Sequence, residues 1–497
     1  PISVNTPLIS PGTITQITVT NNSVVGGIQN PYIVLASWLN QIAESKDLAY
    51  NGVINMGQSH TFSFSLESNE STIDLVRVNY QAILTNPISN TLQIKSLNLE
   101  SFLNPNLDVK VAPNPFYLPL IQDILINADL WSDKPEILSA GYGFEGIEGV
   151  PQGESFVIAA GGAWEYVTTP NPPYRALTSA TTSQGVSTAF GYPTYYADAM
   201  PIVFSWPVLP STVSRTDFSV TLNTGEVVTP YVASINPNLE FNERSTVVIF
   251  GEFGNRLAPG ESGAVYPINV AIVANLKLVG PNGPVSAVGL SKNSTNPYEA
   301  NAGPTLVAAK LSVMSIDGEG IGCCTAFSGD YPNNGVSYYG ESNAQYRLRI
   351  YTTGGFSPDG IASVLPTDFA TFFKIQVTDS DGVESWLTNT GTVYHFPEGN
   401  IEIVGLADLG LAGSTLNDAY VEDFDNYIDI VLKGDQAAMR LITAVEIPAS
   451  GNYKPFYNPG GPGNSPTPGI VYTSPGPYRL QAVTMAIDDP LTVNYGN

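Results

Sequence analysis

The sequence predicts an all-β fold, predominantly antiparallel and β-sandwich-like, with a few short helices and more than one domain. Apolar and polar residues alternate with period two over many short runs, as they do in strands with one buried face. Other runs of strand length are continuously apolar, which is typical of strands covered on both faces. Gly and Pro, at 46 and 39 of 497 residues, punctuate these runs as turn residues do.

The clearest strand signals lie in residues 206–289. Residues 218–229 predict a hairpin, with a turn at 223–225 whose glycine tolerates a positive φ. Residues 245–250 and 268–273 are continuous apolar runs, so we expect both to be strands covered on both faces. This stretch therefore predicts the core of a sandwich.

The N-terminal part predicts a β-rich module with one helix. The helix is expected over residues 30–46, where Asn30 can cap, Pro31 suits the first turn and apolar residues recur at helical spacing. A proline-rich boundary follows, because several prolines come after residue 104. Strands are expected at residues 13–20, 61–66, 75–80 and 92–97, and the chain is expected to divide into 1–112, 113–205 and 206–497.

Residues 113–205 predict a connecting β region rich in Tyr, Pro and Thr, with a short helix between 118 and 131. A Gly-x-Gly-x-x-Gly run begins at Gly141, but Pro151 follows too soon for the helix that a dinucleotide site requires. No organic cofactor is therefore predicted. We expect the Tyr-rich stretch 155–216 to be buried against its neighbours rather than to form an aromatic binding surface, because aromatic clusters are more often core.

The C-terminal part alternates strands, turns and short helices. Its proline- and glycine-rich stretch 453–477 predicts a wrapping loop or a linker, and the strand signal after it favours wrapping. The expected strands are 305–313, 345–351, 428–432 and 480–487, with short helices at 366–374 and 436–442, the latter capped by Asp435, and a hairpin turn at 379–382.

Three residues of one predicted strand are candidate ligand-binding residues. Alternation places Arg347, Arg349 and Tyr351 on one strand face, which is unusual in a chain with only 19 basic residues. Two arginines on one face could clamp a carboxylate, phosphate or sulfate. Ion pairing with neighbouring carboxylates is the alternative, and it is the one we favour.

The densest acidic stretch predicts a metal site. Carboxylates this close cannot all ionise without raised pKa values, a counter-cation or exposure to solvent. A hard cation such as Ca²⁺ fits carboxylate and amide oxygens. An exposed acidic loop, or pairing with Arg347 or Arg349, would account for the stretch equally well. The candidate ligands are Glu422, Asp423, Asp425, Asn426 and Asp429, with Phe424 and Tyr427 as anchors.

Charge and composition exclude several partners. With 44 acidic and 19 basic residues the net charge is −25, which repels nucleic acid and anionic lipid. No run reaches the roughly 18 apolar residues of a membrane-spanning helix, so we expect a soluble chain without membrane insertion. The two cysteines, Cys323 and Cys324, are adjacent and predict either a vicinal disulfide or two reduced thiols, not a metal site. Both His60 and His395 are expected to be structural.

These observations favour a non-enzymatic binding or structural protein of the extracellular space or cell surface, calcium-dependent and carbohydrate-binding, with a neutral polymer as partner. A cytoplasmic location stays open because the sequence shows no signal peptide, and a homo-oligomer is compatible with the sequence. The alternative function is a hydrolase or lyase that acts on a polysaccharide or other neutral polymer through two carboxylates. Acids at Asp317 and Glu319, or within residues 422–429, are the candidates for that chemistry.

Overall fold

A computed structural model describes most of the chain. It describes residues 2–5, 14–21, 27–36, 53–55, 57–65, 75–85, 92–102, 122–142, 144–150, 153–159, 164–167, 175–178, 180–182, 197–235, 244–255, 257–315, 334–360, 364–408, 426–458 and 474–495.

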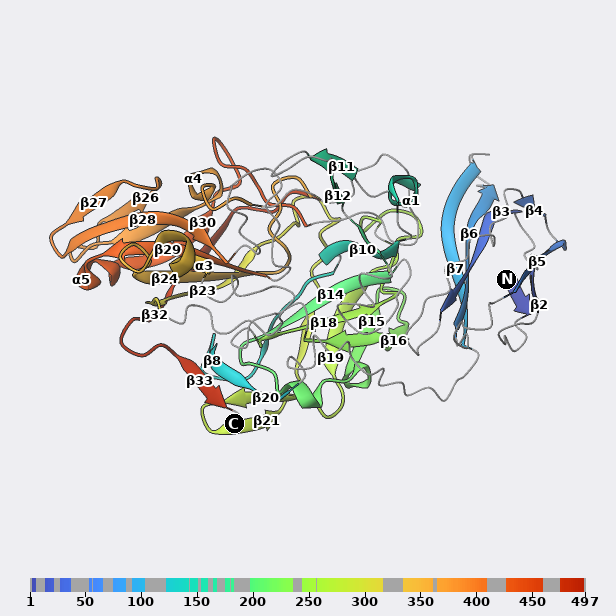
Figure 1. Cartoon of the computed structure of the whole chain (residues 1–497), viewed down its shortest axis with the longest axis horizontal. Helices are drawn as coiled ribbons and strands as arrows, with labels where there is room; N and C mark the ends of the chain where they lie inside the picture. Colours follow the sequence, from blue (N-terminus) through green and yellow to red (C-terminus); the bar gives the residue numbers. More distant parts are fainter. Residues whose placement is uncertain are drawn as a thin grey trace.

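The described residues fold mainly as strands in several sheets, so the predicted all-β class is confirmed. Their pairing is antiparallel except between β10 and β13 and between β23 and β32. Figure 1 shows two sandwich-like bodies, a green one in the middle of the view and an orange-to-red one at one end. None of the described helices is long and apolar enough to cross a membrane.

The first sandwich consists of two sheets that enclose one apolar core. Sheet I has the order β13-β10-β14-β18-β17, with β9 also paired to β14, and sheet II has the order β16-β15-β19-β22. Their strands are β9 (Ile137–Ala140), β10 (Phe144–Val150), β13 (Ala180–Thr182), β14 (Ala197–Phe204), β15 (Phe218–Leu222), β16 (Val227–Val228), β17 (Val232–Ser234), β18 (Thr246–Gly251), β19 (Pro267–Ile272) and β22 (Ser291–Asn293).

Alternation along β15 positions this core, because Phe218, Val220 and Leu222 are buried while the residues between them are half-buried. The predicted hairpin is confirmed as β15 and β16. Strand β18 is buried at every position, as its continuous apolar run predicted. Burial of β19 on both faces is wrong, because Ile268 is 43% exposed and the strand alternates, with one face toward the core.

The second sandwich also consists of two sheets around a core. Sheet III has the order β27-β28-β29-β24-β23-β32 and sheet IV the order β26-β25-β30-β31. Their strands are β23 (Leu306–Val313), β24 (Tyr346–Thr352), β25 (Lys374–Thr378), β26 (Glu384–Leu387), β27 (Val393–Phe396), β28 (Gly399–Ala407), β29 (Tyr427–Gly434), β30 (Ile442–Ile447), β31 (Arg479–Ala482) and β32 (Thr484–Ala486). The predicted strands at 305–313, 345–351, 428–432 and 480–487 are confirmed here.

Short helices and the hairpin turn of this sandwich also match the sequence. The two predicted helices are confirmed as α4 (Phe369–Phe372) and α5 (Gln436–Met439). Asp435 does precede α5, but its side chain accepts the backbone N–H of Asn400 at 2.8 Å instead of capping the helix. The turn at 379–382 closes with a backbone hydrogen bond of 3.0 Å from Gly382 to Asp379. The described part of the chain also contains the α-helices α1 (Glu154–Ala159) and α3 (Asn334–Tyr339) and the 3-10 helices η2 (Pro210–Thr212) and η3 (Arg215–Asp217).

The N-terminal strands form two further sheets, with orders β1-β2-β5 and β4-β3-β6-β7. The helix predicted from residue 30 is wrong over residues 30–36, which belong to β3. Backbone pairing with β4 and β6 overrides the helical spacing, and Pro31 falls at the irregularity between Gln29 and Tyr32, where a missing N–H is tolerated. The strands are β1 (Ile2–Asn5), β2 (Ile14–Asn21), β3 (Gly27–Ala36), β4 (Val53–Ile54), β5 (Ser59–Ser65), β6 (Leu75–Thr85) and β7 (Leu92–Phe102).

The helix predicted between residues 118 and 131 is also wrong over the described residues 122–131, which contain strand β8 (Leu125–Asp129). Its partner is β33 (Thr492–Tyr495), near the other end of the chain. A partner so distant in sequence leaves no local signal, so the apolar spacing alone misled the prediction. Two-stranded ribbons complete the fold: β11 (Trp164–Val167) with β12 (Arg175–Thr178), and β20 (Lys277–Gly280) with β21 (Gly283–Ser286).

Candidate functional site

The three β24 residues that the sequence singles out are all buried. Alternation turns Leu348 and Ile350 into the second core, so Arg347, Arg349 and Tyr351 lie on the opposite face of sheet III. That face packs against the first sandwich, where the hydroxyls of Tyr351 and Thr246 are hydrogen-bonded. The predicted common face therefore lies inside the protein rather than at its surface.

Arg349 is held by two aspartates, Asp429 of the neighbouring strand β29 and Asp408, the residue after β28. The register between β24 and β29 places it opposite Asp429, and its Nε and Nη2 donate to the two carboxylate oxygens at 2.8 and 3.1 Å. Its Nη2 also donates to Oδ2 of Asp408 at 2.7 Å. A guanidinium matches a carboxylate through two parallel hydrogen bonds, so this arrangement fixes both side chains.

Asp129, the last residue of β8, collects three cations. Arg347 Nη2 donates to its two oxygens at 3.3 and 3.2 Å, Arg349 Nη1 lies 3.5 Å from Oδ2, and Lys310 Nζ donates to Oδ1. Burial by itself raises the pKa of Asp129, but Lys310, Arg347 and Arg349 outweigh burial and hold that pKa well below its usual value. Asp129 is therefore ionised at neutral pH.

Together these groups form a buried ion network, defined as Asp129, Lys310, Arg347, Arg349, Asp408 and Asp429. Three positive and three negative side chains balance, and each is at most 7% exposed. An aromatic cluster adjoins it, with Trp131 5.2 Å from Tyr351 and Tyr351 4.2 Å from Tyr427 between ring centroids. Because the members come from β8, β23, β24 and β29 and, for Asp408, from the residue after β28, the network connects distant parts of the chain.

The network determines how the predicted site residues are placed. The ion pairing that the sequence favoured for Arg347 and Arg349 is present, and an external anion would have to displace buried carboxylates to reach them. Among the five predicted metal ligands, Asp429 gives both oxygens to Arg349, and the amide nitrogen of Asn426 donates to the Thr352 carbonyl at 3.0 Å.

The other three predicted metal ligands, Glu422, Asp423 and Asp425, lie outside the described residues, as do Asp317, Glu319 and the two cysteines. Within the part of the chain that the structure describes, no group of three or more His, Cys, Asp or Glu residues is arranged to hold a metal ion. Asp429 and Asn426 thus have other partners in this structure.

Sequence reasoning missed the remaining members of the network. Lys310 carried a usable signal, because a single lysine inside the apolar run 306–311 must find a buried partner. Asp129 and Asp408 carried none, since each lies at the end of a strand, where a surface aspartate is common. Their role depends on contacts across about 180 and 60 residues, respectively, of sequence.

The Tyr-rich stretch is partly buried, as expected, and partly exposed. Strand β14 is buried at every position. On the β11–β12 ribbon, Tyr166 is 56% exposed, and its hydroxyl donates to Glu154 Oε2 at 2.6 Å. Burial of the whole stretch against its neighbours is therefore wrong at Tyr166.

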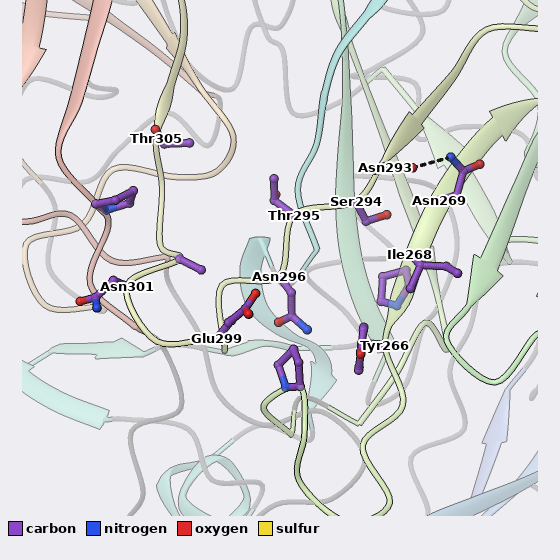
Figure 2. Close-up of a pocket in the computed structure, with 14 residues that line it drawn as sticks. Tyr266, Ile268, Asn269, Asn293, Ser294, Thr295, Asn296, Glu299, Asn301 and Thr305 are labelled. Carbon is purple, nitrogen blue, oxygen red and sulfur yellow. Dashed lines mark hydrogen bonds between the residues drawn. The ribbon is translucent and has the colours of Figure 1, made fainter.

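An open cleft of about 740 Å³ lies where the first sandwich leads into the second. One wall is the end of sheet II, and the other is the segment 294–305 that connects β22 to β23, with Pro477 contributed from the C-terminal part. Figure 2 shows the cleft running from Asn301 and Thr305, past Glu299 and Asn296, to Tyr266, Ile268 and Asn269. Its volume falls within the range of small-molecule sites.

The connecting segment is held in place by the C-terminal part. Ser474 donates its backbone N–H to the Pro297 carbonyl at 3.0 Å, and Gly303 donates to the Pro475 carbonyl at 3.2 Å. Residues 474 and 475 of the predicted wrapping stretch therefore contact the connecting segment, while residues 459–473 lie outside the described residues. A cleft wall braced by backbone hydrogen bonds is preorganised rather than formed by free loops.

The cleft lining mixes polar and apolar groups and is largely uncharged. Asn296 is only 9% exposed, and its Oδ1 accepts the backbone N–H of Tyr298 at 3.0 Å. Its Nδ2 and the Oγ of Ser294 are buried atoms that make no hydrogen bond with the residues that the structure describes. Buried polar atoms are nearly always paired, so these two atoms of the cleft wall need partners that the described residues do not supply. The lining consists of Pro259, Tyr266, Pro267, Ile268, Asn269, Asn293, Ser294, Thr295, Asn296, Glu299, Asn301, Ala302, Thr305 and Pro477.

The sequence predicted only a polar loop at residues 290–304, and it assigned no function there. A signal was present in the run of Lys, Asn, Ser and Thr from residue 292 to 296, but such composition is also that of an ordinary loop. The two histidines have structural contacts, as expected: His60 packs edge-on to Phe62, and His395 Nδ1 lies 2.6 Å from Asn400 Oδ1.

Comparison with known proteins adds nothing to this geometry. No protein-family model matches the chain, and no curated protein sequence is significantly similar to it.

Proposed function

We propose that this protein is a non-enzymatic binding protein that holds a neutral, hydroxyl-rich ligand, a carbohydrate, in the cleft. The observation that carries the proposal is the buried amide nitrogen of Asn296, which lacks a partner among the described residues and belongs to a cleft wall whose one described carboxylate is that of Glu299. An unpaired buried donor costs about 1–3 kcal/mol, and a ligand oxygen that displaced the atoms covering this nitrogen and bonded to it would remove that cost.

The chemistry of the lining supports a carbohydrate. Asparagine amides both donate and accept, as sugar hydroxyls do, and the cleft offers Asn269, Asn293, Asn296 and Asn301. Tyr266 and three prolines supply flat apolar surface against which the C–H groups of a sugar ring can pack. The net charge of −25 disfavours an anionic ligand.

Binding is better supported than hydrolysis. A glycosidase needs two carboxyl groups, about 5 Å or 6.5–9.5 Å apart. Among the described residues that line the cleft, Glu299 is the one that carries a carboxylate. Asp429, a candidate for the alternative function, lies in the buried ion network.

Calcium dependence and an extracellular or cell-surface location belong to the same proposal. They rest on the acidic stretch and on the Asn-, Thr- and Tyr-rich composition. Melting temperatures with and without EDTA test the calcium part, because a cation bound only to the folded protein must stabilise it. An unchanged melting temperature would remove calcium from the proposal.

The binding part is tested with a panel of neutral oligosaccharides derived from cellulose, xylan, mannan and β-1,3-glucan. Binding is measured by isothermal titration with the purified chain and with Asn296→Asp, which keeps the acceptor for Tyr298 and removes the free donor. We expect at least one series to bind and Asn296→Asp to weaken it about tenfold, which is the loss of one buried hydrogen bond.

A matched control is Asn389→Asp, an exposed asparagine outside the cleft, which should leave affinity unchanged. The melting temperature of each variant checks that it is folded. Absence of binding to every series, or equal loss in both variants, would contradict the proposal. Release of new reducing ends that disappears in Glu299→Gln would show the hydrolase instead.

A further inference from the structure

The outer face of sheet II continues from the cleft. Antiparallel register places Thr221 opposite both Val227 and Asn269, and Asn269 opposite Asn293. Their neighbours Val220 and Val270 point into the core, so this cross-strand row of four points outward. Asn269 and Asn293 also line the cleft, and Asn269 Nδ2 donates to Asn293 Oδ1 at 3.2 Å (Figure 2).

A second outward row runs beside the first and has the same character. Ser219 lies opposite Ala271, and Ala271 opposite Ser291. Neither row contains a charged residue, although the chain carries 44 acidic side chains. An uncharged face of hydroxyls and amides does not provide the ion pairs or the buried aromatic anchors of a protein interface.

Exposed apolar side chains border the first row and the cleft. Val227 is 63% exposed at one end of the row, and Ile268 is 43% exposed in the cleft wall. Four strands at a spacing of about 4.8 Å extend roughly 14 Å across the sheet. The outer face of sheet II therefore offers polar groups and apolar contacts across all four strands, well beyond the part of the sheet that lines the cleft.

We infer that the ligand is a linear neutral polysaccharide, with one or two sugar units in the cleft and the following units across the outer face of sheet II. This inference rests on the proposed function. Asn296 marks the cleft end independently, because it is about nine-tenths buried and its amide nitrogen has no hydrogen-bond partner among the described residues. The row Asn293, Asn269, Thr221, Val227 then gives the direction of the chain, because its first two members belong to both surfaces.

The test compares oligosaccharides of two lengths on the full chain. Affinities of the disaccharide and the hexasaccharide are measured for the cellulose, xylan, mannan and β-1,3-glucan series with wild type, Thr221→Glu and Asn296→Asp. In the series that binds, we expect the hexasaccharide to bind at least tenfold more tightly than the disaccharide. Thr221→Glu should remove that gain and leave disaccharide affinity unchanged, whereas Asn296→Asp should weaken both.

A matched control is Ser286→Glu, which places the same new charge at an exposed strand position of the β20–β21 ribbon, outside both surfaces. It should leave both affinities unchanged. Equal affinity for the two lengths, or full hexasaccharide affinity in Thr221→Glu, would overturn the path across sheet II. Binding in the cleft would still stand if Asn296→Asp weakens binding of the disaccharide. Failure of every oligosaccharide to bind would overturn the path and the proposed function together.

Discussion

Two buried carboxylates, those of Asp217 and Asp129, have pKa values shifted in opposite directions. Asp217, in the turn before β15, is fully buried, and its Oδ2 accepts the backbone N–H of Ser214 at 2.9 Å. Burial raises the pKa of Asp217 to about 6, against the lowering effect of that hydrogen bond. Asp129 shows the reverse, because three cations hold its pKa low. The environment of each carboxylate, and not its residue type, determines the free energy of keeping it ionised in the folded protein.

Replacing Asp217 with asparagine should stabilise the protein at neutral pH. The folded protein binds the Asp217 proton more tightly than the unfolded chain does. The stability that protonated Asp217 contributes is therefore fully present below about pH 4 and is lost as pH rises through 6. Asparagine keeps the acceptor without the charge. We expect Asp217→Asn to exceed wild type by about 1–2 kcal/mol at pH 7.5 and to match it near pH 4, as measured by urea unfolding at both pH values. An equal difference at the two pH values would contradict the buried charge.

Replacing Asp429 with asparagine should destabilise the protein strongly. Arg349 would keep its burial but lose the bidentate partner, and breaking a buried pair costs about 3–5 kcal/mol. The control is Asp488→Asn, which breaks an exposed pair with Arg440 and should leave the urea midpoint unchanged. If Asp429→Asn is as stable as wild type, the ion pair between Asp429 and Arg349 is refuted. If EDTA lowers the melting temperature of wild type but not that of Asp429→Asn, Asp429 has a role in metal binding.

At the scale of elements, the last strand supports residues far from it in sequence. Strand β33 pairs with β8, and the carbonyls of Pro490 and Leu491 accept hydrogen bonds from Lys310 Nζ at 3.1 and 3.2 Å. Leu491 also accepts the backbone N–H of Leu130 at 2.8 Å. The two residues that lead into the C-terminal strand therefore close the buried ion network from one side.

Ending the chain after Asp489 should lower stability by more than about 2 kcal/mol. The truncation removes β33 and leaves Lys310 with fewer acceptors, and hydrogen bonds to charged groups are worth about 1.5–3 kcal/mol each. A chain that ends after Tyr495 retains these contacts and should melt like wild type. Equal melting temperatures for both truncations would show that β33 does not support the network.

At the scale of the whole molecule, the buried ion network and the aromatic cluster join the two sandwiches. Asp129 and Thr246 come from the part of the chain that includes the first sandwich, and Arg349 and Tyr351 come from the second. Interfaces between domains are commonly polar and permit motion, but a desolvated, charge-balanced contact of this kind favours a single relative arrangement. The cleft depends on that arrangement, since its walls come from the connection between the two bodies.

The two sandwiches should therefore unfold together. We expect one calorimetric transition with equal calorimetric and van't Hoff enthalpies for wild type at pH 7. Asp129→Asn should separate it into two transitions, because it leaves three buried cations with two carboxylates. Since the pKa of Asp129 is lowered in the folded protein, its contribution is present above about pH 4 and is lost as pH falls below that value, so acid should mimic the variant. Two transitions in wild type at pH 7 would contradict this coupling.

The sequence by itself determined the features that depend on neighbours in the chain. Period-two alternation fixed the β15–β16 hairpin and the common face of Arg347, Arg349 and Tyr351, because successive strand side chains point to opposite sides. Tertiary structure decided what those faces meet. Arg347 and Arg349 are ion-paired inside the protein because the fold brings Asp129 and Asp408 to them from distant parts of the chain. Residues near 30 and 125 form strands because they pair with strands that are not adjacent to them in sequence. The cleft was likewise hidden in the sequence, since its walls meet only when the segment 294–305, sheet II and Pro477 are brought together. The local sequence pattern indicates which secondary structure each segment favours. Burial and ion pairing depend on contacts between segments that are distant in sequence, and these contacts exist only in the folded protein.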